Sequence, residues 1–351
     1  MKYAVGYQLA EGNERPFSEL VEQYNEAISE VYFPWLDTPS GRSALATRHG
    51  YTDWTAQQRL EDDLYKIKTM GKRLDLLFNG NCYGSLAISE RLRNQIASII
   101  EHLGNVVGGV DIVTTTSPFI AETVKKYFPE IEVRASVNMW LGTIKSMQYM
   151  ADIFDSYYVQ REYNRDLNYI RELKKWCDEN GKGLYMLANS GCFAYCTGHS
   201  FHDNLVAHES DVCEVQNVKD FQPYTCWRYL KDPEHRHVLL QNNWVRPEDI
   251  HHYEGLFTTI KLATRMHSRP GMVIDAYSRG HYSGNLLDLC EPGFGSAIAP
   301  YIIDNESLPK DFFEVTSHCG KQCHKCDYCR KAYEGALTEI KPSILDVNSG
   351  I

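Results

Sequence analysis

The stretch RLDLLFNGNCYGSLAISERLRNQIASIIEHLGNVVGGVDIVT, residues 73–114, contains one complete structural repeat. Its first six residues form a short apolar run that predicts a strand, and the Asn-Gly-Asn-Cys-Tyr-Gly segment that follows predicts a turn-forming loop. Residues 89–103 show helical spacing of apolar side chains, and residues 110–114 form a second strand-like run. The stretch therefore predicts a strand–helix–strand unit, which is the building block of a parallel sheet.

The same unit recurs throughout the N-terminal half of the chain. Further strands are predicted at residues 3–7, 31–36, 131–136, 156–159 and 183–188, and further helices at 16–28, 53–70, 117–127, 141–150 and 165–180. An eighth strand is predicted at residues 258–263, with its helix at 270–279. This repetition predicts an α/β fold of the (β/α) TIM-barrel type. A doubly wound open sheet is the alternative, but no Gly-x-Gly-x-x-Gly follows the first strand.

The regular pattern stops after the seventh strand, which suggests how the chain is organised. We interpret residues 1–287 as a barrel-like catalytic domain with a Cys-rich insertion at 190–250, and residues 288–351 as a C-terminal Cys-rich metal-binding segment. The net charge of −10 does not favour general nucleic-acid binding. No signal peptide and no membrane-length apolar run is present, so a soluble, cytoplasmic protein without a membrane partner is expected.

Cysteine placement carries the strongest chemical signal. Four cysteines, called here the loop cysteines, begin directly after the seventh strand, where the catalytic face of a barrel lies: Cys192, Cys196, Cys213 and Cys226. Four thiolates from one loop can hold a 4Fe–4S cluster, which we favour, or a zinc ion. Buried, unligated thiols are the remaining alternative. Cys82 ends the third strand on the same face, and it is an alternative ligand to Cys226.

A second set of four cysteines lies within eleven residues near the C-terminus. These are the tail cysteines: Cys319, Cys323, Cys326 and Cys329. Such close spacing suits thiolates that converge on one centre, either a second 4Fe–4S cluster or a zinc ion. Four exposed thiols without a metal would oxidise readily, which argues against an unligated tail.

Four further residues are candidate catalytic or binding groups. His202 and His208 follow the first two loop cysteines, and imidazole titrates near neutral pH, so either is a candidate acid or base. Hydrogen-bonded loop histidines are the alternative. Lys261 and Arg265 lie at the end of the eighth strand, where a cation can bind a carboxylate or phosphate. A surface ion pair with Glu254 or Asp275 is the alternative for these cations.

Four motifs together resemble the U-32 peptidase family, whose members are also called collagenase-like peptidases. They are LANSGC (187–192) with its Cys-rich continuation, WVRPED (244–249), IKLATR (260–265) and AYSRGHYSGN (276–285). The resemblance implies a (β/α) barrel-like fold that holds a 4Fe–4S cluster on four cysteines. It also implies, for several members, oxygen-independent hydroxylation of a tRNA or ribosomal RNA base or of a ubiquinone precursor, with prephenate as the hydroxyl donor. Other members are called proteases or collagenases.

From these features we predict a U-32-type iron–sulfur enzyme that hydroxylates or similarly modifies an RNA base or a small aromatic metabolite. The first alternative is a collagenase-like peptidase, although the sequence has no Ser/His/Asp motif and no His-Glu-x-x-His. The second alternative is a non-catalytic iron–sulfur partner or electron-transfer subunit. A small-molecule substrate or RNA is the expected partner, and the chain is a candidate for a homodimer or for a heterodimer with a related subunit.

Overall fold

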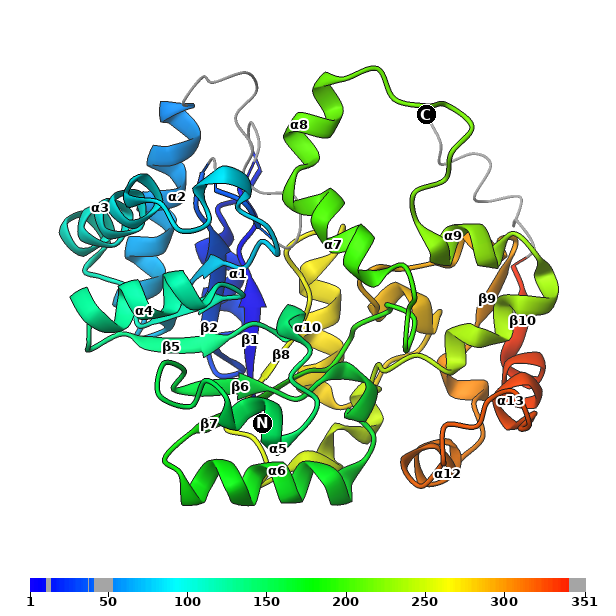
Figure 1. The fold of residues 1–351 in the computed structure, drawn as a ribbon. Helices are drawn as coiled ribbons and strands as arrows, with labels where there is room; N and C mark the ends of the chain where they lie inside the picture. Colours follow the sequence, from blue (N-terminus) through cyan, green and yellow to red (C-terminus); the bar gives the residue numbers. More distant parts are fainter. Residues whose placement is uncertain (11–13, 37, 41–52, 341–351) are drawn as a thin grey trace.

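A closed parallel barrel of eight strands forms the body of the molecule (Figure 1). The computed structural model describes residues 1–10, 14–36, 38–40 and 53–340. Neighbouring strands follow the sequence order, and β1 closes the barrel by pairing in parallel with β8. The strands are β1 (Lys2–Gly6), β2 (Ile28–Pro34), β3 (Arg73–Phe78), β4 (Ile112–Thr115), β5 (Glu132–Ala135), β6 (Ser156–Tyr158), β7 (Gly183–Leu187) and β8 (Thr259–Lys261). The predicted (β/α) barrel is confirmed, and the open-sheet alternative is wrong.

Helices on the outside of the barrel connect the strands. They are α1 (Phe17–Gln23), α2 (Trp54–Thr69), α3 (Glu90–Val107), α4 (Pro118–Tyr127), α5 (Ile144–Gln148) and α6 (Leu167–Glu179), with α10 (Pro270–Arg279) after β8. Local sequence signals set several of their ends. The Asp53 carboxylate accepts a hydrogen bond from the Ala56 amide at 2.9 Å, and the Ser89 hydroxyl accepts one from the Leu92 amide at 3.1 Å. Such N-caps satisfy amides that the first helical turn leaves without a partner.

The insertion and the tail contain short elements on one side of the barrel. In the insertion these are α7 (His199–Ala207), α8 (Glu209–Glu214) and α9 (Thr225–Leu230), followed by 3-10 helices at Pro233–Leu240 and Pro247–Tyr253. In the tail they are a 3-10 helix at Leu286–Leu289, α11 (Gly295–Ile298), β9 (Tyr301–Ile303), α12 (Phe312–Ser317), α13 (Tyr328–Ala336) and β10 (Leu337–Glu339). Other 3-10 helices span Gly84–Leu86, Val137–Met139, Arg161–Tyr163 and Asn305–Ser307.

Insertion and tail share a second hydrophobic core, separate from the barrel core. Trp244 from the insertion stacks on Phe312 from α12, with ring centroids 5.6 Å apart. Helix α13 contacts the 3-10 helix Pro233–Leu240, and β9 pairs antiparallel with β10. The sequence analysis assigned these segments to different domains, with a boundary after residue 287. That boundary stays a prediction, but the two segments bury their apolar side chains against each other.

The helices of the described residues are all too short or too polar to cross a lipid bilayer.

Candidate active site

A cavity of about 100 Å³ lies at the carboxyl ends of the barrel strands. Four residues singled out from the sequence line it: Cys192, His202, Lys261 and Arg265. Its other lining residues come from β2, β3 and β7, from the segments after β3, β5, β6, β7 and β8, and from the tail: Tyr32, Leu77, Asn79, Val137, Asn138, Arg161, Leu187, Ser190, His199, Asp203, Ala263, Met266 and Glu291. Parallel strands bring their following loops to one end of a barrel, which is why residues far apart in sequence meet here.

Lys261 lines this cavity. It is the last residue of β8, and its side chain is buried with the ammonium 3.7 Å from the centre of the Tyr32 ring. Burial lowers the pKa of Lys261 to about 8, while the negative charges of Asp75 and Glu30 act in the opposite direction. An ammonium in such surroundings is poorly hydrated, so it is available to an anion that enters the cavity.

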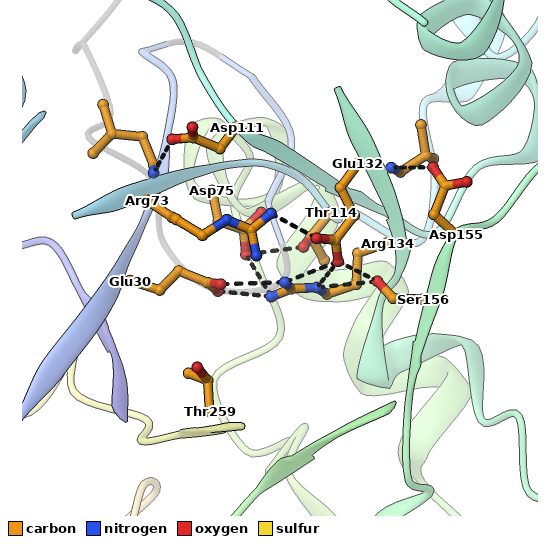
Figure 2. Close-up of polar contacts among 12 residues, drawn as sticks. Glu30, Arg73, Asp75, Asp111, Thr114, Glu132, Arg134, Asp155, Ser156 and Thr259 are labelled. Carbon is orange, nitrogen blue, oxygen red and sulfur yellow. Dashed lines mark hydrogen bonds and ion pairs between the residues drawn. The ribbon is translucent and has the colours of Figure 1, made fainter. Parts of the chain in front are cut away.

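Below Lys261, the barrel interior contains a network of charged side chains (Figure 2). Arg134 of β5 donates to both carboxylate oxygens of Glu30 on β2, at 2.6 and 3.2 Å, and to Glu132 at 3.0 Å. Asp75 of β3 lies 3.8 Å from Arg134 and accepts a hydrogen bond from Thr114 at 2.9 Å. Burial raises the pKa of Asp75 to about 6, and Arg134 opposes this shift.

The sequence analysis missed this network, although a signal for it exists. Charged residues alternate with apolar ones inside short buried strands, as in RLDLLF (73–78) and EVRA (132–135). An interior position normally carries a branched aliphatic residue in this type of barrel. A charged side chain there indicates either an ion pair or a functional group.

Arg265 follows β8 and approaches the cavity from the side of β1. Its Nη1 donates a hydrogen bond of 2.8 Å to the Ser40 hydroxyl. A Cβ atom on Gly6 would lie only 2.7 Å from the Cβ of Arg265, so glycine at that position permits the close approach. Asp275, the ion-pair partner considered from the sequence, is bound by Arg279 at 2.9 Å.

Arg161 is a third cation in the cavity wall, and no motif in the sequence singled it out. It is 7% exposed, its Nη1 lies 3.4 Å from the Ser190 hydroxyl, and its guanidinium lies 4.9 Å from the Trp140 ring. Within the part of the chain that the structure describes, no carboxylate forms an ion pair with it. Three cations of one cavity therefore come from the end of β8 and from the segments after β6 and β8, which favours an anionic ligand.

The two predicted histidines lie in different places. His202 of α7 lines the cavity, and its ring lies 5.0 Å from that of Tyr224. His208 is not among the lining residues, and it hydrogen-bonds the Cys82 thiol. That bond lowers the pKa of Cys82 and raises the pKa of His208. The sequence analysis did not select His199, whose Nε2 lies 2.7 Å from the Asp203 carboxylate at the cavity.

Three of the loop cysteines lie near one another. Cys192 lines the cavity, and burial raises the pKa of Cys226 to about 11, with further contributions from Cys192 and Cys196. Cys213 is exposed on α8, which projects away from the barrel beyond α7 (Figure 1). In residues 1–10, 14–36, 38–40 and 53–340, no three His, Cys, Asp or Glu side chains are grouped as a metal site. The donor chemistry nevertheless fits a thiolate-ligated centre.

The segment that carries Cys192 is fixed by the tail. Ser190 and Glu291 form a parallel bridge, and the Gly191 amide donates to the Glu291 carbonyl at 3.0 Å. A Cβ atom on Gly191 would lie 2.1 Å from the Pro292 carbonyl oxygen, so only glycine fits. The position of the first loop cysteine thus depends on a contact with residues about a hundred positions later in the chain.

The tail cysteines form a separate group. Three of them are exposed, and Cys329, at the start of α13, is half-buried. Burial raises the pKa of Cys329 to about 11, and Cys323, Cys319 and Cys326 add to the shift. These cysteines are not grouped as a metal site in the described residues, so their convergence on one centre stays a prediction.

Backbone strain occurs next to these groups. Among the described residues, three non-glycine residues have a positive φ: Trp140 (55°), Tyr195 (54°) and Lys321 (56°). Trp140 contacts Arg161 and His199 at the cavity, Tyr195 precedes Cys196, and Lys321 lies between two tail cysteines. Strained backbone often occurs at ligand sites, where the surrounding structure holds it in place.

The motifs WVRPED (244–249) and AYSRGHYSGN (276–285) do not line the cavity, and their polar side chains form structural contacts instead. Arg246 and Asp249 of WVRPED form a bidentate ion pair at 2.9 and 3.2 Å. Glu248 accepts hydrogen bonds from the Tyr282 amide at 2.7 Å and from Asn305 at 2.9 Å, which connects the barrel to the tail. Asn285 of the last motif N-caps the 3-10 helix Leu286–Leu289.

Comparison with known proteins gives one curated relative and several similar folds. No family model matches the chain. The chain is 24% identical over 274 residues to a protein of Methanocaldococcus jannaschii named "Uncharacterized protease MJ1657", covering 76% of this chain and 77% of the relative. The solved structure of "the U32 Peptidase Mk0906" is 15% identical, with a TM-score of 0.49 over 74% of this chain and 92% of that one. A glycoside hydrolase family 5 mannosidase from Rhizomucor miehei is 10% identical, with a TM-score of 0.42 over 74% of this chain and 80% of that one.

Proposed function

We propose that the chain belongs to the U-32 peptidase family and that it is an iron–sulfur enzyme that modifies a small anionic substrate in the barrel cavity. The motifs around Cys192, Arg246, Lys261 and Asn285, together with the Methanocaldococcus jannaschii relative, support the family. The observation that carries the proposal is the presence of Cys192 and three cations, Arg161, Lys261 and Arg265, in the wall of one cavity.

The loop cysteines would hold a 4Fe–4S cluster at the edge of the cavity. Cys192, Cys196 and Cys226 act electrostatically on one another and would supply three thiolates. The fourth ligand would be Cys213, after movement of α8, or Cys82, which approaches the same region through its contact with His208. When bound, such a cluster supplies Lewis acidity at an open iron site or passes single electrons.

The chain's own groups would bind and orient the substrate. Lys261 and Arg265 bind carboxylates, and Arg161 adds a third positive charge on the side of Cys196. His202 would hold or move a proton at the cavity wall, because imidazole exchanges protons near neutral pH. His208 lies away from the cavity and has no part in this proposal.

The number of cations suits a dicarboxylate. Two carboxylates would each find a cation, and a planar guanidinium can bind one of them through two hydrogen bonds. Prephenate, which the family resemblance implies as hydroxyl donor, has two carboxylates. Oxygen-independent hydroxylation of a small aromatic metabolite or an RNA base is therefore the reaction that we propose.

The test combines metal analysis with ligand binding. The full chain is purified anaerobically, its iron and sulfide are measured, and dicarboxylates including prephenate are titrated against the cluster absorbance. Arg265→Lys should weaken binding roughly 10-fold or more, because an ammonium cannot reproduce the guanidinium fork, while the iron content stays the same. Arg279→Lys, at a surface ion pair, is the matched control and should bind normally. Equal affinity of Arg265→Lys and the unchanged protein would contradict the proposed substrate contact.

Two alternatives have defined tests. A peptidase would cleave a peptide panel after metal loading, and the Cys82–His208 contact would be its candidate nucleophile and base. A non-catalytic iron–sulfur subunit would bind no dicarboxylate, and loss of its cluster would leave the activity of its partner unchanged.

A further inference from the structure

Lys261 carries its amine on a rigid part of the barrel. Its backbone carbonyl accepts a hydrogen bond from the Ala188 amide at 3.0 Å, and β8 pairs in parallel with both β7 and β1. The side chain is 8% exposed and lines the cavity. Its Nζ lies 3.7 Å from the centre of the Tyr32 ring and 5.4 Å from the centre of the Tyr158 ring. A side chain held in this way on a strand has a defined position for chemistry.

The amine of Lys261 is not held in an ion pair. Glu30 and Asp75, the carboxylates whose charges act on it, lie 2.6 and 3.8 Å from Nη1 of Arg134. In the part of the chain that the structure describes, no carboxylate forms an ion pair with Lys261. Burial, together with the positive charges of Arg134 and Arg265, lowers the pKa of Lys261 to about 8. About a tenth of this amine is therefore neutral at pH 7, and a neutral amine is a nucleophile.

Tyr32 fixes the backbone between Lys261 and Arg265. Its hydroxyl donates to the Leu262 carbonyl at 2.8 Å and accepts from the Thr264 amide at 3.2 Å, while its ring lies against the Lys261 ammonium. One buried side chain therefore positions the amine and the backbone that leads to the guanidinium. A guanidinium can bind a carboxylate through two hydrogen bonds, which leaves the amine for a different group of the same ligand.

We propose that Lys261 forms an imine with the carbonyl group of a 2-oxo acid, whose carboxylates are bound by Arg161 and Arg265. The neutral amine nitrogen attacks the carbonyl carbon, and the carbonyl oxygen takes up a proton to give a carbinolamine. The C–O bond then breaks, this oxygen leaves as water, and a C=N bond remains. The ammonium and the ketone together give a protonated imine and one water molecule, so the step needs no oxidant, reductant or additional proton. The protonated imine withdraws electrons from the neighbouring carbon and activates its C–H bonds.

This inference rests on the proposed function, because it concerns the same cavity and the same anionic ligand, and it names the substrate class. As an ammonium, Lys261 attracts the incoming carboxylates; as a neutral amine, it reacts with the carbonyl between or beside them. Arg161 and Arg265 line the cavity with it and supply the carboxylate contacts that remain during the covalent step.

The test traps the imine in the full chain, purified anaerobically. Protein is incubated at pH 7 with 2-oxoglutarate and sodium cyanoborohydride, which reduces an imine to a stable secondary amine, and the modified lysine is located by peptide mass mapping. We expect a single adduct on Lys261, formed roughly 100-fold faster than on an ordinary exposed lysine, because a pKa of about 8 leaves that much more neutral amine than the usual value near 10.4. Lys145, an exposed lysine whose ammonium lies 5.2 Å from the Tyr149 ring, is the internal comparison in the same map.

A matched ligand and two variants separate the covalent step from binding. 2-Hydroxyglutarate has the same two carboxylates but no ketone, so it should bind, as measured by calorimetry, and give no adduct. Lys261→Met removes the amine and should abolish the adduct, whereas Lys145→Met should keep it. The mapping of the unchanged protein tests the proposal even if Lys261→Met does not fold.

The outcomes distinguish this inference from the proposed function. Binding of both acids without an adduct on Lys261, or adducts spread over exposed lysines without preference for Lys261, would overturn the imine and leave the anion site intact. Binding of neither acid would overturn both. An adduct on Lys261 in protein that holds no iron would support the imine and contradict the iron–sulfur part of the proposed function.

Discussion

At the scale of single residues, Lys261 connects the barrel interior with the cavity. Its ammonium lies over the Tyr32 ring, and its charge interacts with Asp75 and Glu30 below it. The sequence analysis selected Lys261 because a cation ends an apolar strand. The structure adds that burial lowers its pKa to about 8, which makes its charge sensitive to pH.

We therefore expect dicarboxylate binding to depend on pH. The folded protein holds Lys261 protonated below about pH 8, so affinity should be full there and should fall as pH rises through that value. Lys261→Gln should bind roughly 10- to 100-fold more weakly at pH 7 and should lose the inflection, because one charged hydrogen bond is removed. Lys145→Gln, a surface lysine over Tyr149, should keep the normal profile. An unchanged inflection in Lys261→Gln would assign it to another group.

The Cys82–His208 contact gives a second residue-scale prediction. His208 lowers the pKa of Cys82, so this thiol should react faster with iodoacetamide than it would without the imidazole. In metal-free protein, His208→Ala should shift the pH midpoint of Cys82 alkylation upward and slow the reaction at pH 7. Cys213, which is exposed on α8, is the internal control, and its alkylation rate in the same peptide map should be the same in both proteins. Identical Cys82 rates in both proteins would show that the imidazole has no effect.

At the scale of elements, the barrel strands are joined by charges as well as by backbone hydrogen bonds. Arg134 of β5 reaches across the interior to Glu30 of β2, and Asp75 of β3 lies beside it (Figure 2). Glu132, two residues before Arg134 on β5, is bound by Arg134 and Arg73, and the pKa of Glu132 is lowered to about 2. The charges of this network, those of Glu30, Asp75 and Arg134, also act on the ammonium of Lys261.

Removing one member of the network should be more damaging than removing two. Arg134→Met leaves Glu30 buried without its partner, and it should lower the free energy of unfolding by about 3–5 kcal/mol. Adding Glu30→Leu should recover part of that loss, because the unpaired charge is then gone. Denaturant unfolding of the two variants measures the difference. A double variant less stable than Arg134→Met would mean that packing, and not charge pairing, dominates at this layer.

At the scale of the whole molecule, the described residues form a barrel core and a second hydrophobic core shared by the insertion and the tail. Trp244 belongs to the second core, donates its indole N–H to the Leu239 carbonyl at 3.0 Å, and lies under Arg165. The bridge between Ser190 and Glu291, both of which line the cavity, joins the insertion to the tail. The tail is thus part of the structure that positions the cavity loops.

We expect Trp244→Ala to weaken the second core selectively. The loss of a buried indole should lower the free energy of unfolding by about 3–5 kcal/mol. Limited proteolysis should then cut within residues 286–340 before it cuts the barrel. Trp54→Ala, at a side chain that is 72% exposed, should change stability by no more than about 0.5 kcal/mol. Equal protease resistance of the tail in both variants would mean that Trp244 does not hold it.

The sequence alone determined the elements and their repetition. Apolar periodicity and caps such as Asp53 and Ser89 act within a few residues, so the strand–helix units and the barrel could be predicted from them. The predicted helix at 270–279 matches α10, and the residue types of Cys192, Lys261 and Arg265 already indicated ligands for a metal and an anion.

Only the tertiary structure decided which of these residues meet. Closure of the barrel brings Arg161 and His199 to the cavity, places His208 outside it, and turns Glu30 and Arg134 toward each other across the interior. It also packs the insertion against the tail. These contacts join residues far apart in the chain, and their free energy depends on burial and on long-range charge, which no local pattern contains.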